Sequence, residues 1–475
     1  MHHRVMWHYH LKQHPFHPKK HPRDLDEEAR KVILSSSIWK LFAKFALPSI
    51  FGMLMYAIYV FIDAVFVGQW VGKEALAAIS IVQPLTLINM GIMAFMGMGS
   101  ASLLSRAIGA RDESTVSKIL GNNILFIFIF SLIFMFLGYF FAAPLVHFMG
   151  GRGQILAFGT NYFRIVVLGS FFINFIGSTN MLIRAEGQIK AAMILITVGS
   201  ILNICLDPIF IKILGMGIEG AAIATVISMF ITSIVTLIYF FRGDSELSLR
   251  KKGFHLAPHL IKDIAPVGVS AIAMQLMTVI QQILIFKSVG FYGKGDDLAL
   301  IGATLNMLSF ALIPMWGISA GLQPIIGMNF GAKQYSRVKE AFNKFLLAST
   351  IIALVIWAIF MIFPSKILGL YITDPGLASS GVYMFRIVMS AFFLQGFILI
   401  PATLFQSIGK GKMASIVLLV REILLFAPVV IVLPIFMGLN GIWISIPVAD
   451  AVIVVLASIL FIRVFRAMVA NKQGS

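Results

Sequence analysis

Residues 124–141 read ILFIFIFSLIFMFLGYFF, a run without charge that is long enough to cross a bilayer once as a helix. A similar run occupies residues 423–437. Of all 475 residues, 59% are hydrophobic and 12% are charged, and the mean hydropathy is +0.93. A soluble chain of this length could not bury so much apolar surface. In lipid the backbone must form its own hydrogen bonds, in helices or in a closed barrel. These runs lack the alternation of apolar and polar residues that is typical of barrel strands. The sequence therefore predicts an all-α polytopic membrane protein.

Twelve apolar segments follow a polar N-terminal tail. We predict spans at about 40–70, 78–107, 119–142, 157–183, 191–214, 219–241, 262–290, 298–328, 340–363, 381–408, 413–436 and 440–466. Several are longer than one crossing requires, which indicates tilt or bending. Helix-breaking prolines mark the candidate bend points. These are Pro48, Pro84, Pro266 and Pro314.

The chain repeats itself at a separation of 222 residues. SRAIGARDESTV at 105–116 resembles MNFGAKQYSRV at 328–338, and FRIV at 163–166 recurs at 385–388. Parallel repeats of six helices imply two lobes around a central cleft. The predicted organisation is a tail (1–37), a first lobe (38–241), a basic linker (242–261), a second lobe (262–468) and a C-terminal tail (469–475).

Positive charge is distributed unevenly between the loops. With the N-terminus in the cytoplasm, about 28 of the 37 Lys and Arg residues fall on the cytoplasmic side. This bias predicts a bacterial inner-membrane protein with both termini cytoplasmic. It also explains the net charge of +17 without nucleic acid as a partner.

The tail holds seven of the ten histidines: His2, His3, His8, His10, His14, His17 and His21. We interpret it as a disordered cytoplasmic extension, because its irregular spacing is unlike a fixed-ligand metal site, although metal binding stays open. The single cysteine, Cys205, excludes an intrachain disulfide. No nucleotide-binding loop, HExxH or CxxC motif occurs, so we expect no enzyme activity and no cofactor.

Four acids fall inside apolar spans, where a carboxylate is costly and is therefore a functional candidate. They are Asp63, Asp207, Glu422 and Asp450. Asp63 and Asp207 lie at similar depth in the first and fifth spans. Asn203 shares a helical face with Asp207, and Thr225 opens the sixth span at comparable depth. This oxygen-rich set predicts a coupling-ion site for sodium or a proton.

The second lobe provides an internal comparison. The repeat places Gln281 opposite Asp63, Ile446 opposite Thr225 and about Val429 opposite Asp207, so the second lobe lacks the equivalent acid set. Glu422 and Asp450 remain secondary candidates, with Gln281. Each acid either lines the cleft or pairs with Arg386, Lys287 or a backbone group. Glu422 follows Arg421, but sequence neighbours on a regular helix do not face each other.

The apolar part, about 40–468, resembles the MATE family of multidrug and toxic-compound extrusion transporters. The resemblance rests on LPSIFGMLMYAIYVFIDAVFVG in the first span, the loops SRAIGARD and NFGAKQ, LNICLDP in the fifth span, GIEGAAIAT in the sixth, and the turns RAEGQ and QSIGKGK. It implies two six-helix lobes and export of organic cations in exchange for sodium or protons. The sequence is most similar to the DinF-like and MepA-like bacterial branch, whose first-lobe coupling residues fall on Asp63, Asn203, Asp207 and Thr225. The NorM-like branch has acids where this chain has Gln275 and, approximately, Gln395, so a second-lobe cation site of that kind is not expected.

We therefore expect an antiporter that works by alternating access, with a bend of the first helix near Pro48 as the gating element. Its 25 methionines and 42 phenylalanines suit lipophilic cationic substrates. We expect it to act as a monomer whose other contacts are with membrane lipid. A lipid-linked oligosaccharide flippase on a related scaffold is the first alternative, although only four basic residues fall inside spans. An ion channel is the second, against which the one-sided acid set argues.

Overall fold

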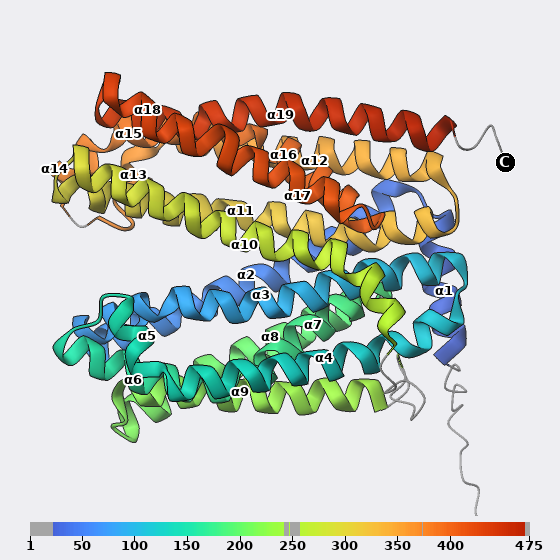
Figure 1. Cartoon of the computed structure of the whole chain (residues 1–475), viewed down its shortest axis with the longest axis horizontal. Helices are drawn as coiled ribbons and strands as arrows, with labels where there is room; N and C mark the ends of the chain where they lie inside the picture. Colours follow the sequence, from blue (N-terminus) through green and yellow to red (C-terminus); the bar gives the residue numbers. More distant parts are fainter. Residues whose placement is uncertain (1–21, 242–246, 248–256, 373, 471–475) are drawn as a thin grey trace, which may run out of the picture.

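The computed structural model describes residues 22–241, 247, 257–372 and 374–470. Within these residues the secondary structure is helical, without strands, and the helices form two bundles lying side by side (Figure 1). The seven tail histidines lie outside the described residues.

The first bundle contains the six spans predicted for the first lobe. They are α2 (Ile38–Trp70), α3 (Lys73–Ala110), α4 (Glu113–Phe140), α6 (Gly153–Leu168) with α7 (Ser170–Ala185), α8 (Ile189–Asp207) with the π-helical turn η1 (Pro208–Ile213), and α9 (Gly217–Phe241). A short helix, α5 (Ala142–Phe148), joins α4 to α6.

The second bundle repeats this order. Its spans are α10 (Pro258–Tyr292), α11 (Gly295–Gly331), α12 (Tyr335–Ile362), α15 (Val382–Met389) with η3 (Phe392–Leu394) and α16 (Gln395–Ser407), α17 (Gly411–Leu419) with the π-helical turn η4 (Val420–Phe426) and α18 (Ala427–Met437), and α19 (Leu439–Ala470). The short helices α13 (Pro364–Leu368) and α14 (Pro375–Ser380) lie between α12 and α15.

The number of spans matches the prediction. In the described part of the chain, eleven helical segments are long and apolar enough to cross a membrane, and the pair α6–α7 makes the twelfth. This pair is bent by 54° at Gly169. Pro48, Pro84, Pro266 and Pro314, in contrast, lie inside helices that continue through them.

The two bundles share a core at one end only. We call the end that carries α1 (Pro22–Ser35), Ala110 and Gly331 the terminal end, and the end that carries α5, α13 and α14 the distal end (Figure 1). One cluster of buried apolar residues joins both bundles, from Leu41 and Leu104 to Leu322 and Phe345. Two other clusters each belong to a single bundle, around Val67 in the first and around Ile285 in the second. The bundles are therefore sealed together at the terminal end and have separate cores at the distal end.

Small residues bring the two bundles into backbone contact at this seal. Gly321 of α11 lies against the backbone of Ala46 in α2, and Gly109 of α3 lies against the carbonyl group of Met328. Small residues are what allow helices in a membrane to approach this closely. The Gln323 side chain adds a hydrogen bond to Ser105 Oγ at 3.2 Å.

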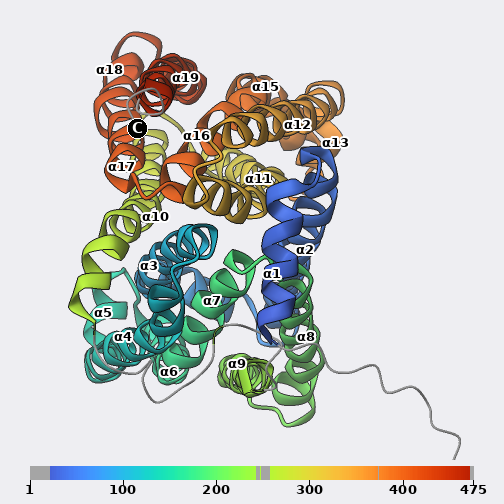
Figure 2. The same ribbon diagram turned by 90° about the vertical axis from the view of Figure 1, so that its right-hand side faces the viewer.

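Helix α1 differs from the expected disordered tail. It lies across the terminal end of the molecule, spans the boundary between the two bundles and packs against α11 (Figures 1 and 2). The Arg30 guanidinium donates to the carbonyl groups of Ile108 at 3.1 Å and Gly109 at 3.0 Å, which end α3 of the first bundle. Arg337 of the second bundle donates to the carbonyl groups of Ile33 at 3.0 Å and Ser36 at 2.7 Å. These bonds add partners to carbonyl groups at or next to helix ends, and they join α1 to both bundles.

Candidate coupling-ion site

The fifth and sixth spans bring three of the predicted site residues together. Asn203 and Asp207 are fully buried and lie one turn apart on α8. The Asn203 amide is 3.5 Å from Asp207 Oδ1 and 3.4 Å from Thr225 Oγ1 on α9. Both distances are at the long end for a hydrogen bond, so the amide holds its partners loosely.

The helix changes its geometry directly after Asp207. Pro208 has no backbone N–H to continue the α-helical ladder, and residues 208–213 form the π-helical turn η1. Such turns are frequent at functional sites, because they open the backbone locally. Asp207 is therefore the last residue of a regular helix and lies beside a widened turn.

Three oxygen atoms of this site lack a hydrogen-bond partner among the described residues. They are Asp63 Oδ1, Asn203 Oδ1 and Asp207 Oδ2, and all three are buried atoms. Asp63, which lies on α2, is close enough to Asp207 for Coulombic interaction. Buried polar atoms normally have a hydrogen-bond partner. Three unpaired oxygens, two of which belong to carboxylates, can therefore serve as ligands for a cation.

Two tyrosines that the sequence analysis did not select belong to the same environment. Tyr162 of α6 is 9% exposed and interacts electrostatically with both Asp63 and Asp207. Tyr59 is also 9% exposed, interacts with Asp63, and precedes it by four residues on the same face of α2. The i, i+4 spacing could have identified Tyr59, but no sequence signal connects Tyr162 to α2.

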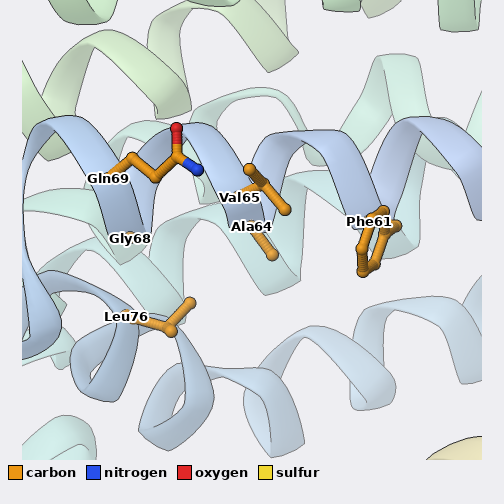
Figure 3. A pocket seen from close by; sticks show the side chains of 6 residues that line it. All are labelled: Phe61, Ala64, Val65, Gly68, Gln69 and Leu76. Atoms are coloured by element: carbon orange, nitrogen blue, oxygen red, sulfur yellow. The ribbon is translucent and has the colours of Figure 1, made fainter. Parts of the chain in front are cut away.

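An apolar pocket of about 310 Å³ lies on another face of α2 (Figure 3). Its lining consists of Phe61, Ala64, Val65, Gly68, Gln69 and Leu76. Asp63 is not among these residues, and the helical repeat places it on the opposite side of α2 from Phe61 and Val65. The pocket is therefore separate from the acid set.

The second lobe contains a buried charged cluster around the secondary candidates Glu422 and Asp450, away from the positions that align with the first-lobe set. Asp450 and Glu422 are each 2% exposed. Arg421 donates to Asp450 Oδ1 from Nε at 3.0 Å and from Nη2 at 2.7 Å, and it also pairs with Glu422. Gln395 Nε2 donates to Asp450 Oδ2 at 2.8 Å.

Two of the expected pairings in this lobe were wrong. Neither Arg386 nor Lys287 is the partner of the acids, since Arg386 is exposed and donates to the carbonyl group of Met361 at 3.2 Å. Arg421 and Glu422 do face each other, because both lie in the π-helical turn η4, where the spacing of a regular helix does not hold. Gln281 is partly buried on α10 and is outside this cluster.

The chain matches the model of a known protein family. The family model MatE matches residues 48–209 and again residues 270–432. The chain belongs to the MatE family. The two matches begin 222 residues apart, which confirms the internal repeat. As a MATE protein, the chain is a membrane transporter and not an enzyme.

Characterised relatives and solved structures agree with this assignment. The multidrug export protein MepA of Staphylococcus aureus is 25% identical over 431 residues, which are 91% of this chain and 95% of MepA. MepA of Staphylococcus saprophyticus is 24% identical over the same length. The outward-facing conformation of a multidrug resistance MATE transporter has a TM-score of 0.88 at 24% identity and covers 92% of this chain and 98% of its own. A MOP superfamily transporter from Pyrococcus furiosus gives the same values. In this MATE chain, Asp63, Asn203 and Asp207 lie inside the first family match, and Thr225 follows it.

Proposed function

We propose that the chain is a multidrug exporter that exchanges organic cations for sodium ions or protons, with the coupling-ion site in the first lobe. The observation that carries this proposal is the set of three unpaired, buried oxygens on Asp63, Asn203 and Asp207. Intramembrane carboxylates without a protein partner are typical of ion pathways. The likeness to MepA, named as a multidrug export protein, supports the substrate class.

The state of the molecule fits one half of such a cycle. Both bundles share a core at the terminal end, while their cores are separate at the distal end. We place the terminal end in the cytoplasm of a bacterial plasma membrane, because basic residues gather in its loops and tails. The structure then corresponds to the outward-open state. A C-terminal fluorescent-protein fusion that folds and fluoresces, with an inactive phosphatase fusion at the same position, tests this orientation.

In the proposed cycle the coupling ion enters the first-lobe site from the outside. Its single positive charge offsets one of the two negative charges of Asp63 and Asp207, which lowers the cost of keeping these carboxylates in the membrane while the lobes rearrange. A lipophilic cation and the coupling ion compete for this negative charge, and the ion bound in one state biases the equilibrium between the two states. The chain acts as a monomer in this scheme and needs no cofactor.

The flippase alternative has less support from the charges. A pyrophosphate-linked substrate needs free basic groups in the cleft. Arg421 already pairs with two carboxylates, and the Arg164 guanidinium lies over the Tyr139 ring at 5.7 Å. The buried acids of the first lobe would also repel such an anion.

Exchange of Asp207 for asparagine tests the proposal. The variant keeps the size of the side chain and removes its charge. Transport of dye into everted vesicles, which corresponds to efflux from the cell, should therefore be lost, while insertion and thermal stability persist. Asp296→Asn is the matched control, because Asp296 is exposed at the start of α11. Undiminished efflux by Asp207→Asn would overturn the site. Efflux driven by a sodium gradient after collapse of the proton gradient would identify sodium as the coupling ion.

A further inference from the structure

The charged cluster of the second lobe is not electrically balanced. Arg421 supplies one positive charge, whereas Glu422 and Asp450 supply two carboxylates, and both carboxylates are 2% exposed. With both acids ionised the cluster carries one net negative charge inside the lobe. Such a charge is costly at membrane depth unless another cation joins it.

The geometry shows where that cation belongs. Asp450 Oδ1 accepts from Arg421 and Oδ2 accepts from Gln395, and Glu422 Oε1 accepts from Arg421. Glu422 Oε2 is buried and has no partner among the described residues. The one unpaired oxygen of the cluster is thus on the acid that makes the fewer bonds.

A proton suits this single unpaired oxygen better than a metal ion does. A hard cation needs several oxygen ligands, and three of the four carboxylate oxygens here already accept hydrogen bonds. A proton needs only Glu422 Oε2. Its uptake would leave Arg421 matched one to one with Asp450, through the two bonds that already join them.

We propose that this cluster is a second proton-binding site, in which Glu422 takes up one proton from the aqueous phase and returns it during the transport cycle. The charged groups that act on Glu422 are Arg421 from its own helix and Asp450 from α19. The other helices packed against η4 are α10, α17 and α18, and in the described part of the chain they bring no further charge to bear on Glu422. The proposal rests on the proposed function only in taking the chain for an ion-coupled transporter.

The two sites use corresponding helices of the two lobes, although their polar residues lie at different positions along those helices. The first-lobe set uses the fifth and sixth spans, α8 and α9, and the second-lobe cluster uses their repeats, the eleventh and twelfth spans. The arrangements differ in one respect: the second lobe has its own tethered cation, Arg421. A single proton is therefore enough to neutralise it, whereas the first-lobe pair of Asp63 and Asp207 has no such counter-charge among its hydrogen-bond and ion-pair partners in the described residues.

Infrared difference spectroscopy of the full chain in lipid, between acid and alkaline pH, tests this site. The wild type should show a protonated-carboxyl band from a buried acid, and Glu422→Gln should lose that carboxyl and bind one proton fewer per chain in a titration. Asp207→Asn and the surface control Glu340→Gln should keep it. A full band in Glu422→Gln, or a band lost only with Asp450→Asn, would overturn the assignment.

A second variant guards against misfolding. If Glu422→Gln does not fold, Glu422→Asp keeps the acid on a shorter side chain, and the band should move in frequency. An unmoved band would contradict the proposal. The first-lobe assignment fails separately, by undiminished efflux in Asp207→Asn, so the two failures are distinguishable.

Discussion

Replacing Gly321 with alanine should weaken the seal between the lobes at the terminal end. The added Cβ would lie 2.8 Å from Ala46 Cα and N and 2.9 Å from the carbonyl carbon of Phe45. Ordinary contacts of a Cβ lie at 3.4–4 Å. All three neighbours are backbone atoms, so no rotamer change can relieve the clash, and α2 and α11 must separate.

The size of the effect follows from the cost of overpacking. An extra carbon in a well-packed interior costs about 1–3 kcal/mol. This cost applies only while the terminal end is sealed, because separation of the lobes removes the contact. A shift of about 1.4 kcal/mol changes a two-state ratio tenfold, so the outward-open population should fall roughly 5- to 100-fold relative to the alternative state.

The matched control is Gly290→Ala. Gly290 lies in α10, and a Cβ added there meets no atom within 4 Å. Both substitutions remove a flexible residue from a helix and should favour the helical backbone by about 0.5–1 kcal/mol in either state. The control therefore isolates the contact with α2 from the general effect of alanine.

Distances between two spin labels report the equilibrium directly. Exposed serines at the terminal end offer one site per lobe, Ser114 and Ser336, once Cys205 has been replaced. The wild type should show one short distance, and Gly321→Ala should add a longer one. If the two distributions coincide, or if Gly290→Ala produces the same change, the seal does not set the conformational equilibrium as argued.

Two further substitutions test local contacts of the terminal end. Arg337→Ala removes the bonds to the carbonyl groups of Ile33 and Ser36, each worth about 1.5–3 kcal/mol for a charged donor, so trypsin should cut within α1 at least tenfold faster while insertion persists. Asp112→Ala removes the N-cap of α4 and should cost about 1 kcal/mol at neutral pH, measured as a lower melting temperature. Hydrogen bonds from Thr115 hold the pKa of Asp112 below its ordinary value, so the cap stabilises the fold at neutral pH, and the advantage of the wild type should shrink as the pH falls below about 4.

The number and order of the spans could be predicted because both follow from length and hydropathy. Residue depth was also enough to group Asn203, Asp207 and Thr225, since each lies at a countable distance from a span end. This reasoning needs no knowledge of packing, and it therefore works for residues on consecutive helices. It could not find Tyr162, whose place near Asp63 depends on how α6 packs against α3 and α9.

The second lobe shows where residue-by-residue alignment of the repeats fails. Alignment placed Val429 and Ile446 opposite Asp207 and Thr225 and so indicated no equivalent acid set at those positions, while Glu422 and Asp450 remained secondary candidates. The structure has Glu422 and Asp450 on the same two helices, a turn or more away along the chain. Repeats conserve which helices pack together, while the position of a polar group along each helix can move. The sequence analysis also assumed a regular α-helix, in which the neighbouring side chains of Arg421 and Glu422 would not face each other. This assumption was wrong because both residues lie in a π-helical turn, which the sequence does not indicate.

Helix α2 connects the candidate ion site to the seal. It carries Asp63 in its distal half and contacts Gly321 through Ala46 in its terminal half. The two points are 17 residues apart, which is about 25 Å along an α-helix. Pro48 lies between them, where the ladder lacks one hydrogen bond and the helix bends most easily. A change of charge at Asp63 can therefore affect the seal through α2 alone. Pro48, where α2 bends most easily, lies next to the contact between Ala46 and Gly321 that must open.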